Sequence, residues 1–380
     1  MNYLKIFKIC FIVLIASILV INVQGCGKKE SSKLPTDPTK AAELCQKAEE
    51  ALEKKNYQEA EKLYEEVLTI EPNNNEALFG SAMSSLINLE QNQKIKDLEK
   101  KINGEGKSLI TARDNFVGVA GKTMASFVMS AVKDPIQASE IQDALDTDVI
   151  PAIDKALKKL GVIENSGSFK YIAKKKVYDT DKDYEIDLAD IYALDSSMNI
   201  IRSILALLVS YNLDIKDYKV AKEDPLSIIT SGHANYESNF LKLRSNFRIA
   251  QFRENILTAI EKARKSVESM CNETDSQEDD IIKKPSAKEK SDILTELKKG
   301  EDWLNYPMKE NINGNIVTID LKQLFVNPLI DIKEYLPSLE YGDPINKKDI
   351  KVKEFNLKDP TFKGLLPGMT NEQLKKIMKS

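Results

Sequence analysis

Residues 41–74 read AAELCQKAEEALEKKNYQEAEKLYEEVLTIEPNN, and this stretch decides the fold class. Small and apolar side chains recur every three or four residues, first over 48–52 and then over 60–70. Such spacing is typical of the buried face of an α-helix. Asn56-Tyr57 separates the two runs, and Glu71-Pro72-Asn73-Asn74 ends the second. The pattern therefore predicts two short antiparallel helices in succession.

The same stretch resembles a tetratricopeptide (TPR) repeat, whose helix pairs stack into protein-binding scaffolds. The resemblance rests on small residues at the helix crossing, aromatic residues that fill the gap and a proline that begins the next turn: Ala48, Ala60, Tyr57, Tyr64 and Pro72. Leu44 and Lys55 depart from the family pattern, where Trp and Gly are common.

A second unit begins at Glu76–Ala82, at the offset that the family implies, but Lys94 stands where a small residue belongs at the crossing. We therefore expect TPR-like repeats over residues 41–106. Such units need roughly three neighbours to bury a continuous core, so helices further along the chain are expected to complete it.

The remainder of the chain is predicted to be a helical body over 107–271, an acidic linker over 272–290, and a C-terminal helix and wrapping tail over 291–380. Helical spacing is found at Leu109–Val132, Pro135–Leu160, Asp190–Leu213, Tyr236–Met270 and Ser291–Leu304. Strand signals are found at Phe169–Tyr178, Tyr184–Leu188 and Ile316–Leu321. The uncharged run of the helix at 190–213 is too short to span a bilayer. The predicted fold class is mainly α: a TPR-like helical repeat or helix bundle with a small antiparallel β ribbon near 169–188 and an irregular, Pro-rich C-terminal segment.

The first residues have the pattern of an export signal. Lys5 and Lys8 precede an apolar run over 9–23, and Val23-Gln24-Gly25-Cys26 resembles the bacterial lipoprotein box. The resemblance implies that residues 1–25 are removed, that a lipid is attached to Cys26, and that residues 26–40 form a flexible tether. The protein is then expected to be exported and lipid-anchored to a bacterial membrane, facing outside the cytoplasm. An ordinary secretory peptide and an uncleaved anchor are the alternatives.

Composition and motif spacing exclude several kinds of partner and binding site. The 55 Lys and Arg residues nearly balance the 59 Asp and Glu residues, so no nucleic-acid partner is expected. The single histidine, His233, excludes multi-histidine metal sites. Residues 118–123, GVAGKT, do not have the spacing of a nucleotide phosphate loop, because Phe116 occupies the position of its first glycine. No nucleotide, catalytic residue or enzyme activity is predicted.

One acidic run matches the spacing of a calcium-binding loop: Asp179, Asp181, Asp183, Asp187 and Asp190. Tyr184 occupies the turn position at which such loops require glycine. The alternative is an acidic hairpin followed by a helix that Asp187 or Asp190 caps.

Two cysteines and four arginines each allow two interpretations. Cys45 and Cys271 could pair or could be two small buried side chains. Four arginines of the predicted helix at 236–270 could meet an anionic partner or pair within the chain: Arg244, Arg248, Arg253 and Arg264.

These features predict a non-catalytic, protein-binding scaffold of the cell envelope that acts through its TPR-like helices. Its expected partners are the membrane, through the lipid on Cys26, and other envelope proteins or peptides; no cofactor is expected. The alternative is a solute- or calcium-binding accessory lipoprotein of a transport system. An open concave face beside residues 44–82 would favour the scaffold, whereas a closed apolar cavity inside the bundle would favour the solute binder.

Overall fold

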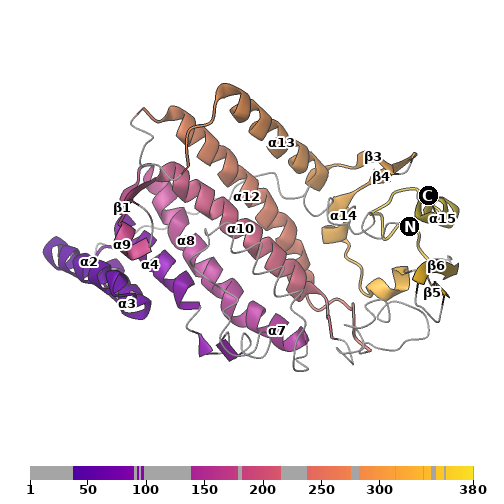
Figure 1. The fold of residues 1–380 in the computed structure, drawn as a ribbon, viewed down its shortest axis with the longest axis horizontal. Helices are drawn as coiled ribbons and strands as arrows, with labels where there is room; N and C mark the ends of the chain where they lie inside the picture. The colour runs from indigo at the N-terminus through magenta and orange to yellow at the C-terminus, as the bar shows by residue number, and fades with distance from the viewer. Residues whose placement is uncertain are drawn as a thin grey trace.

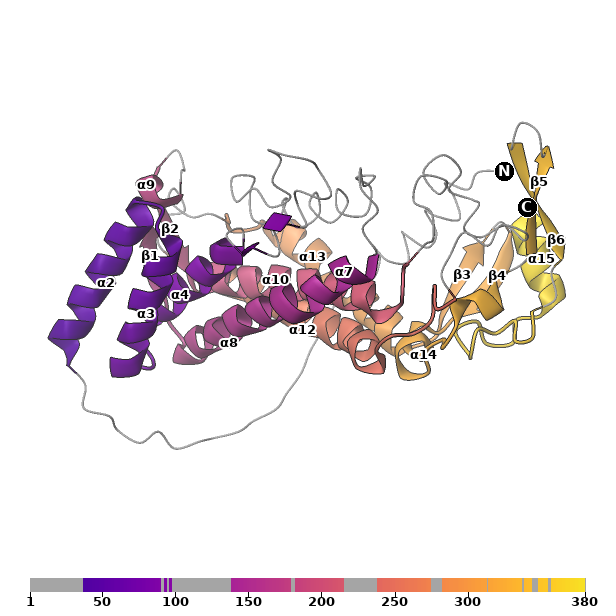
Figure 2. The same cartoon turned by 90° about the horizontal axis from the view of Figure 1, so that it is seen from below.

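The computed structural model describes residues 37–89, 92–93, 96–97, 138–178, 182–214, 238–274, 282–312, 314–336, 338–343, 348–354 and 357–379. These residues are mainly helical, which confirms the predicted fold class. The N-terminal helices form one end of the molecule, which we call the first end. The long helices of the body follow along the chain, and the C-terminal segment forms the opposite end (Figures 1 and 2). The segment Leu109–Val132, Gly118–Thr123 and His233 lie outside the described residues.

The first end consists of three consecutive helices: α2 (Pro38–Glu53), α3 (Tyr57–Ile70) and α4 (Asn75–Asn88). Each begins at an Asp or Asn whose side chain accepts a hydrogen bond from a backbone amide of the first turn, namely Asp37, Asn56 and Asn74. Such caps satisfy amides that have no partner inside the helix. The local sequence therefore sets the start of all three helices.

The body is built from a segmented helix and two long helices. The elements are α7 (Ala138–Ala144), the π-turn η2 (Leu145–Val149), α8 (Ile150–Ser166), α10 (Leu188–Ser210) and α12 (Asn246–Asn272). In Figure 1, α10 lies between α8 and α12. By length and hydropathy α10 is the one described helix that could cross a membrane. Here it is a core helix of the body, because it buries Ile191, Met198 and Leu205 among apolar side chains of the neighbouring elements.

In the described part of the chain, three separate antiparallel strand pairs accompany the helices. They pair β1 (Lys170–Ala173) with β2 (Tyr184–Asp187), β3 (Met308–Ile312) with β4 (Asn315–Ile319), and β5 (Ser338–Asp343) with β6 (Lys348–Glu354). The predicted strand over 169–178 was too long, because the chain turns into the short helix α9 (Lys175–Tyr178). The predicted ribbon near 169–188 corresponds to β1 and β2, whereas β4 pairs with its own neighbour β3.

Two predicted helix starts were wrong. The helix predicted from Tyr236 begins at Asn246, because Ser245 caps it and the residues before it form isolated bridges, Leu243 with Tyr211 and Lys242 with Asp331. The helix predicted from Ser291 is α13 (Ala287–Asn305), which begins earlier because Ser286 and Glu289 form a capping box.

The C-terminal segment adds α14 (Leu321–Val326), the 3-10 turn η4 (Ile332–Tyr335) and α15 (Asn371–Lys379). The sequence predicts a tail that wraps across the bundle, whereas this segment gathers at one end of the body (Figures 1 and 2). Val317, Leu357 and Leu374 from the segment are buried in one core with Ile256 of α12 and Leu304 of α13. It therefore shares a core with the ends of α12 and α13.

Candidate functional site

An open hollow of about 440 Å³ runs along one face of α3. Its lining side chains are Gln58, Glu61, Lys62, Glu65, Glu66 and Thr69. Intervals of three and four residues bring all six to one side of the helix. We call this surface the α3 hollow. It lies inside the range 44–82, beside which an open concave face was expected if the protein is a scaffold.

The opposite side of α3 holds the helix in place. Ala60, Tyr64 and Val67 have no exposed surface and share one core with Ala48 of α2. On the α4 side, a Cβ atom at Gly80 would lie 2.3 Å from two ring carbons of Tyr64. Only glycine allows α4 this close to α3, so Gly80 sets the spacing of the helices behind the hollow.

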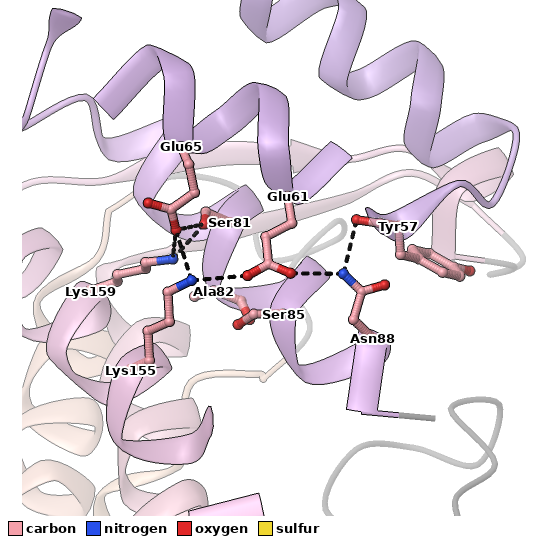
Figure 3. Close-up of polar contacts among 9 residues, drawn as sticks. All are labelled: Tyr57, Glu61, Glu65, Ser81, Ala82, Ser85, Asn88, Lys155 and Lys159. Atoms are coloured by element: carbon pink, nitrogen blue, oxygen red, sulfur yellow. Dashed lines mark hydrogen bonds and ion pairs between the residues drawn. The ribbon is translucent and has the colours of Figure 1, made fainter. Parts of the chain in front are cut away.

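Two lysines of α8 contact two carboxylates of the hollow (Figure 3). Lys155 Nζ lies 3.0 Å from Glu61 Oε1 and 3.2 Å from Glu65 Oε1, and Lys159 Nζ lies 2.5 Å from Glu65 Oε1. The Ser81 hydroxyl of α4 also donates to Glu65 Oε1, at 2.8 Å. The edge of the α3 hollow is thus connected to both α4 and α8.

The side-chain amide of Asn88 holds the other carboxylate, that of Glu61, in place. Asn88 Nδ2, at the end of α4, donates to Glu61 Oε2 at 2.8 Å and to the backbone oxygen of Tyr57 at 3.2 Å (Figure 3). Glu61 is therefore held between α4 and α8, in a defined position on the wall of the hollow.

The ionisation of this network follows from its geometry. Burial would raise the pKa of Glu65, but hydrogen bonds from Lys159 and Ser81 outweigh burial and lower the pKa to about 2. Burial lowers the pKa of Lys159, and the ion pair with Glu65 offsets this only in part. Because 40% of the Glu65 side chain is exposed, water screens these charges, and we assign the network a positioning role rather than a large stabilisation.

Three of the five residues that carry the repeat resemblance lie in the core behind the hollow. Ala48, Ala60 and Tyr64 are buried together, Tyr57 begins α3 and is half-buried, and Pro72 is exposed in the turn after α3. Lys55, which stands where the family has glycine, adopts a left-handed backbone with φ of 58°. This conformation is the physical reason why glycine suits the position.

The acidic run is only partly described, since Asp179 and Asp181 lie outside the described residues, as does Cys26. Asp183 accepts a hydrogen bond from the Lys175 amide at 2.8 Å. Asp187 and Asp190 form the capping box of α10, the role that the alternative to calcium foresees. In the described part of the chain no group of three or more His, Cys, Asp or Glu side chains is placed to hold a metal ion.

The other candidate residues have partners within the chain. Arg244 pairs with Asp143, Arg248 with Asp146 and Arg264 with Glu301. Arg253 donates to the backbone oxygen of Leu304 at 3.1 Å. These contacts agree with the interpretation that the arginines pair internally, although Arg244 precedes the helix.

Neither described cysteine forms a disulfide. Cys45 is buried in α2 and Cys271 is half-buried near the end of α12. Burial, followed by the negative charges of Glu76, Glu71 and Glu49, raises the pKa of the Cys45 thiol to about 12. Cys45 therefore stays a neutral, packed side chain.

Sequence reasoning missed the network of Glu61, Glu65, Lys155 and Lys159. A signal was available, because each pair is spaced by four residues and the two pairs have opposite charge. No known protein family matches this chain, and no curated protein or solved structure matches it either.

Proposed function

We propose that this protein is a lipid-anchored, non-catalytic scaffold of the bacterial envelope, which binds a segment of another protein in the α3 hollow. The observation that carries the proposal is the open hollow along α3, within the range 44–82. An open surface on a packed helical layer suits a peptide or a neighbouring protein better than a small solute, which is usually enclosed.

The charge of this end indicates the kind of segment that would bind. Residues 37–89 contain eleven acidic residues and five lysines, a net charge of −6. The hollow itself is lined by three glutamates and one lysine, and Lys155 and Lys159 of α8 pair with two of these glutamates. The acidic excess therefore comes from residues around the hollow, such as the exposed Glu43 and Glu50 of α2. Electrostatic complementarity therefore favours a partner segment that carries basic side chains.

Site-specific photo-cross-linking in cells tests the binding face. A photoreactive residue at Thr69, which is exposed in the hollow, is expected to form an adduct with a distinct partner that mass spectrometry identifies. The control is the same residue at Lys47, which is exposed on α2 and does not line the hollow. Equal adducts from both positions, or none from Thr69, would contradict the proposal. A captured segment without basic residues would contradict only its expected charge.

The lipid anchor is tested by Cys26→Ser. We expect this variant to take up no labelled fatty acid and to leave the membrane fraction, because residues 27–40 are polar and offer no other anchor. The matched control is Cys10→Ser, which changes a cysteine inside the segment that we expect to be removed and should leave labelling intact. Continued labelling of Cys26→Ser would show that the lipid is not on this residue.

A further inference from the structure

Three ionisable side chains meet inside the body, one from each of its main helices. They are Glu164 of α8, Asp195 of α10 and Lys262 of α12, with exposed side-chain fractions of 7%, 4% and 13%. Lys262 Nζ contacts Glu164 Oε2 and lies 3.3 Å from Asp195 Oδ2. We call these residues the buried triad. Its ion pairs connect α8 to α12 and α10 to α12.

The charges of the buried triad do not balance when every group is ionised. Two carboxylates and one ammonium leave one uncompensated negative charge, which is costly away from water. Asn199 Nδ2 donates to Asp195 Oδ1 at 2.6 Å, whereas Glu164 Oε1 is buried without a hydrogen-bond partner. One added proton would neutralise the triad.

The two carboxyl groups are placed to share that proton. Glu164 and Asp195 bind the same ammonium group, because Lys262 Nζ contacts Glu164 Oε2 and lies 3.3 Å from Asp195 Oδ2. One lysine compensates only one of two carboxylates held this close together, so a proton on either carboxyl group relieves their repulsion. The geometry and the charge balance thus point to the same singly protonated pair.

The other titratable groups around the triad do not replace the proton. From α10, Tyr192 has its ring 6.0 Å from Lys262 Nζ and 5.8 Å from Lys265 Nζ. From α12, Lys265 Nζ lies 2.5 Å from Glu261 Oε1, so these two charges compensate each other. Burial and the charge of Glu164 raise the pKa of Tyr192, so the phenol stays neutral at the pH values at which a buried carboxyl group titrates.

We propose that the buried triad is a proton-controlled clasp: the folded body holds one proton between Glu164 and Asp195, and its loss at alkaline pH loosens the end of α8 from α10 and α12. The clasp makes the cohesion of the body depend on pH. It is independent of the lipid and of the α3 hollow.

The direction of the ionisation agrees with the clasp. Burial first, and then the charge of Asp195, raises the pKa of Glu164 from 4.5 to about 8, and burial also raises the pKa of Asp195. Burial would lower the pKa of Lys262, but Asp195 and Glu164 outweigh it and raise that pKa, so the lysine stays charged. A raised carboxyl pKa stabilises the fold fully below about pH 4.5, and this stabilisation is lost as pH rises through about 8.

Thermal unfolding of the purified full chain at pH 6 and pH 9 tests the clasp with Glu164→Gln. Glutamine keeps the size of the side chain and has no proton to lose. The melting temperature of the variant minus that of the wild type is expected to rise by roughly 4 °C or more between pH 6 and pH 9. Glu254→Gln, which removes an exposed charge from α12, should show a difference that does not change with pH. The same difference at both pH values for Glu164→Gln would overturn the clasp.

Hydrogen exchange of the wild-type chain tests the clasp without any substitution. After correction for the intrinsic pH dependence of exchange, residues 157–166 of α8 are expected to lose protection at pH 9 relative to pH 6. Residues 41–53 of α2 lie away from the buried triad and serve as the internal reference. Equal changes in protection in the two segments would contradict the proposal.

Discussion

Gly80→Ala is expected to destabilise the fold by roughly 1–3 kcal/mol or more, because the new methyl group would overlap the ring of Tyr64. The Cβ atom would lie 2.3 Å from two ring carbons, and Tyr64 has no exposed surface toward which its ring could move. α4 would have to shift away from α3, and the packing of the two helices behind the hollow would be disrupted. Urea denaturation followed by circular dichroism measures the change in the free energy of unfolding.

Gly161→Ala provides the matched control, since it is the same substitution inside another helix. A Cβ atom at Gly161 in α8 would meet no atom within 4 Å. Alanine is favoured over glycine in a helix interior, so this variant should be stabilised by roughly 0.5–1 kcal/mol. Equal effects of the two substitutions would mean that α3 and α4 do not approach closely at Gly80.

Phe79→Ala is expected to cost roughly 3–5 kcal/mol, through lost burial and the cavity that remains. Phe79 is 2% exposed, and its ring centroid lies 5.6 Å from that of Phe169 and 5.1 Å from that of Tyr171. These contacts connect α4 with β1 and the chain before it. Urea denaturation followed by circular dichroism measures the loss of stability. We also expect α2, α3 and α4 to lose their protection from hydrogen exchange together.

The control for Phe79 is Phe247→Ala on α12. Phe247 is 64% exposed, so its removal should change the stability by no more than about 0.5 kcal/mol. A similarly small effect of Phe79→Ala would contradict the packing between α4 and β1.

Some helix starts could be predicted from the local sequence and others could not. The sequence places the break between two helices at Asn56-Tyr57 and offers Asp187 or Asp190 as the cap of a later helix, and in the structure Asn56 caps α3 and Asp187 caps α10. The start of α12 could not be predicted from periodicity, because apolar side chains such as Phe240 continue the helical spacing before Ser245. Phe240 is buried there without being helical, since tertiary contacts of the preceding residues override the local pattern.

The contacts of the candidate site could not be predicted from local patterns. The periodicity of α3 predicts which residues face the core, and therefore that Glu61, Glu65 and Glu66 lie on the other side. Whether that side is open, covered or paired depends on where α8 passes. The contact between Lys159 and Glu65 joins residues 94 positions apart, and no local rule predicts such a contact.

The sequence by itself determined the mainly helical class and the packing face of α2 and α3, because helical periodicity acts over a few residues. For the start of α10 it offered two interpretations, a calcium loop or a cap by Asp187 or Asp190. Only the tertiary structure decided that the polar face of α3 borders an open hollow and that Gly80 sets the spacing of α3 and α4 behind it. It also decided that Glu164, Asp195 and Lys262 form ion pairs inside the body. The physical reason is that burial and charge pairing depend on the distances between segments. The path of the whole chain sets these distances.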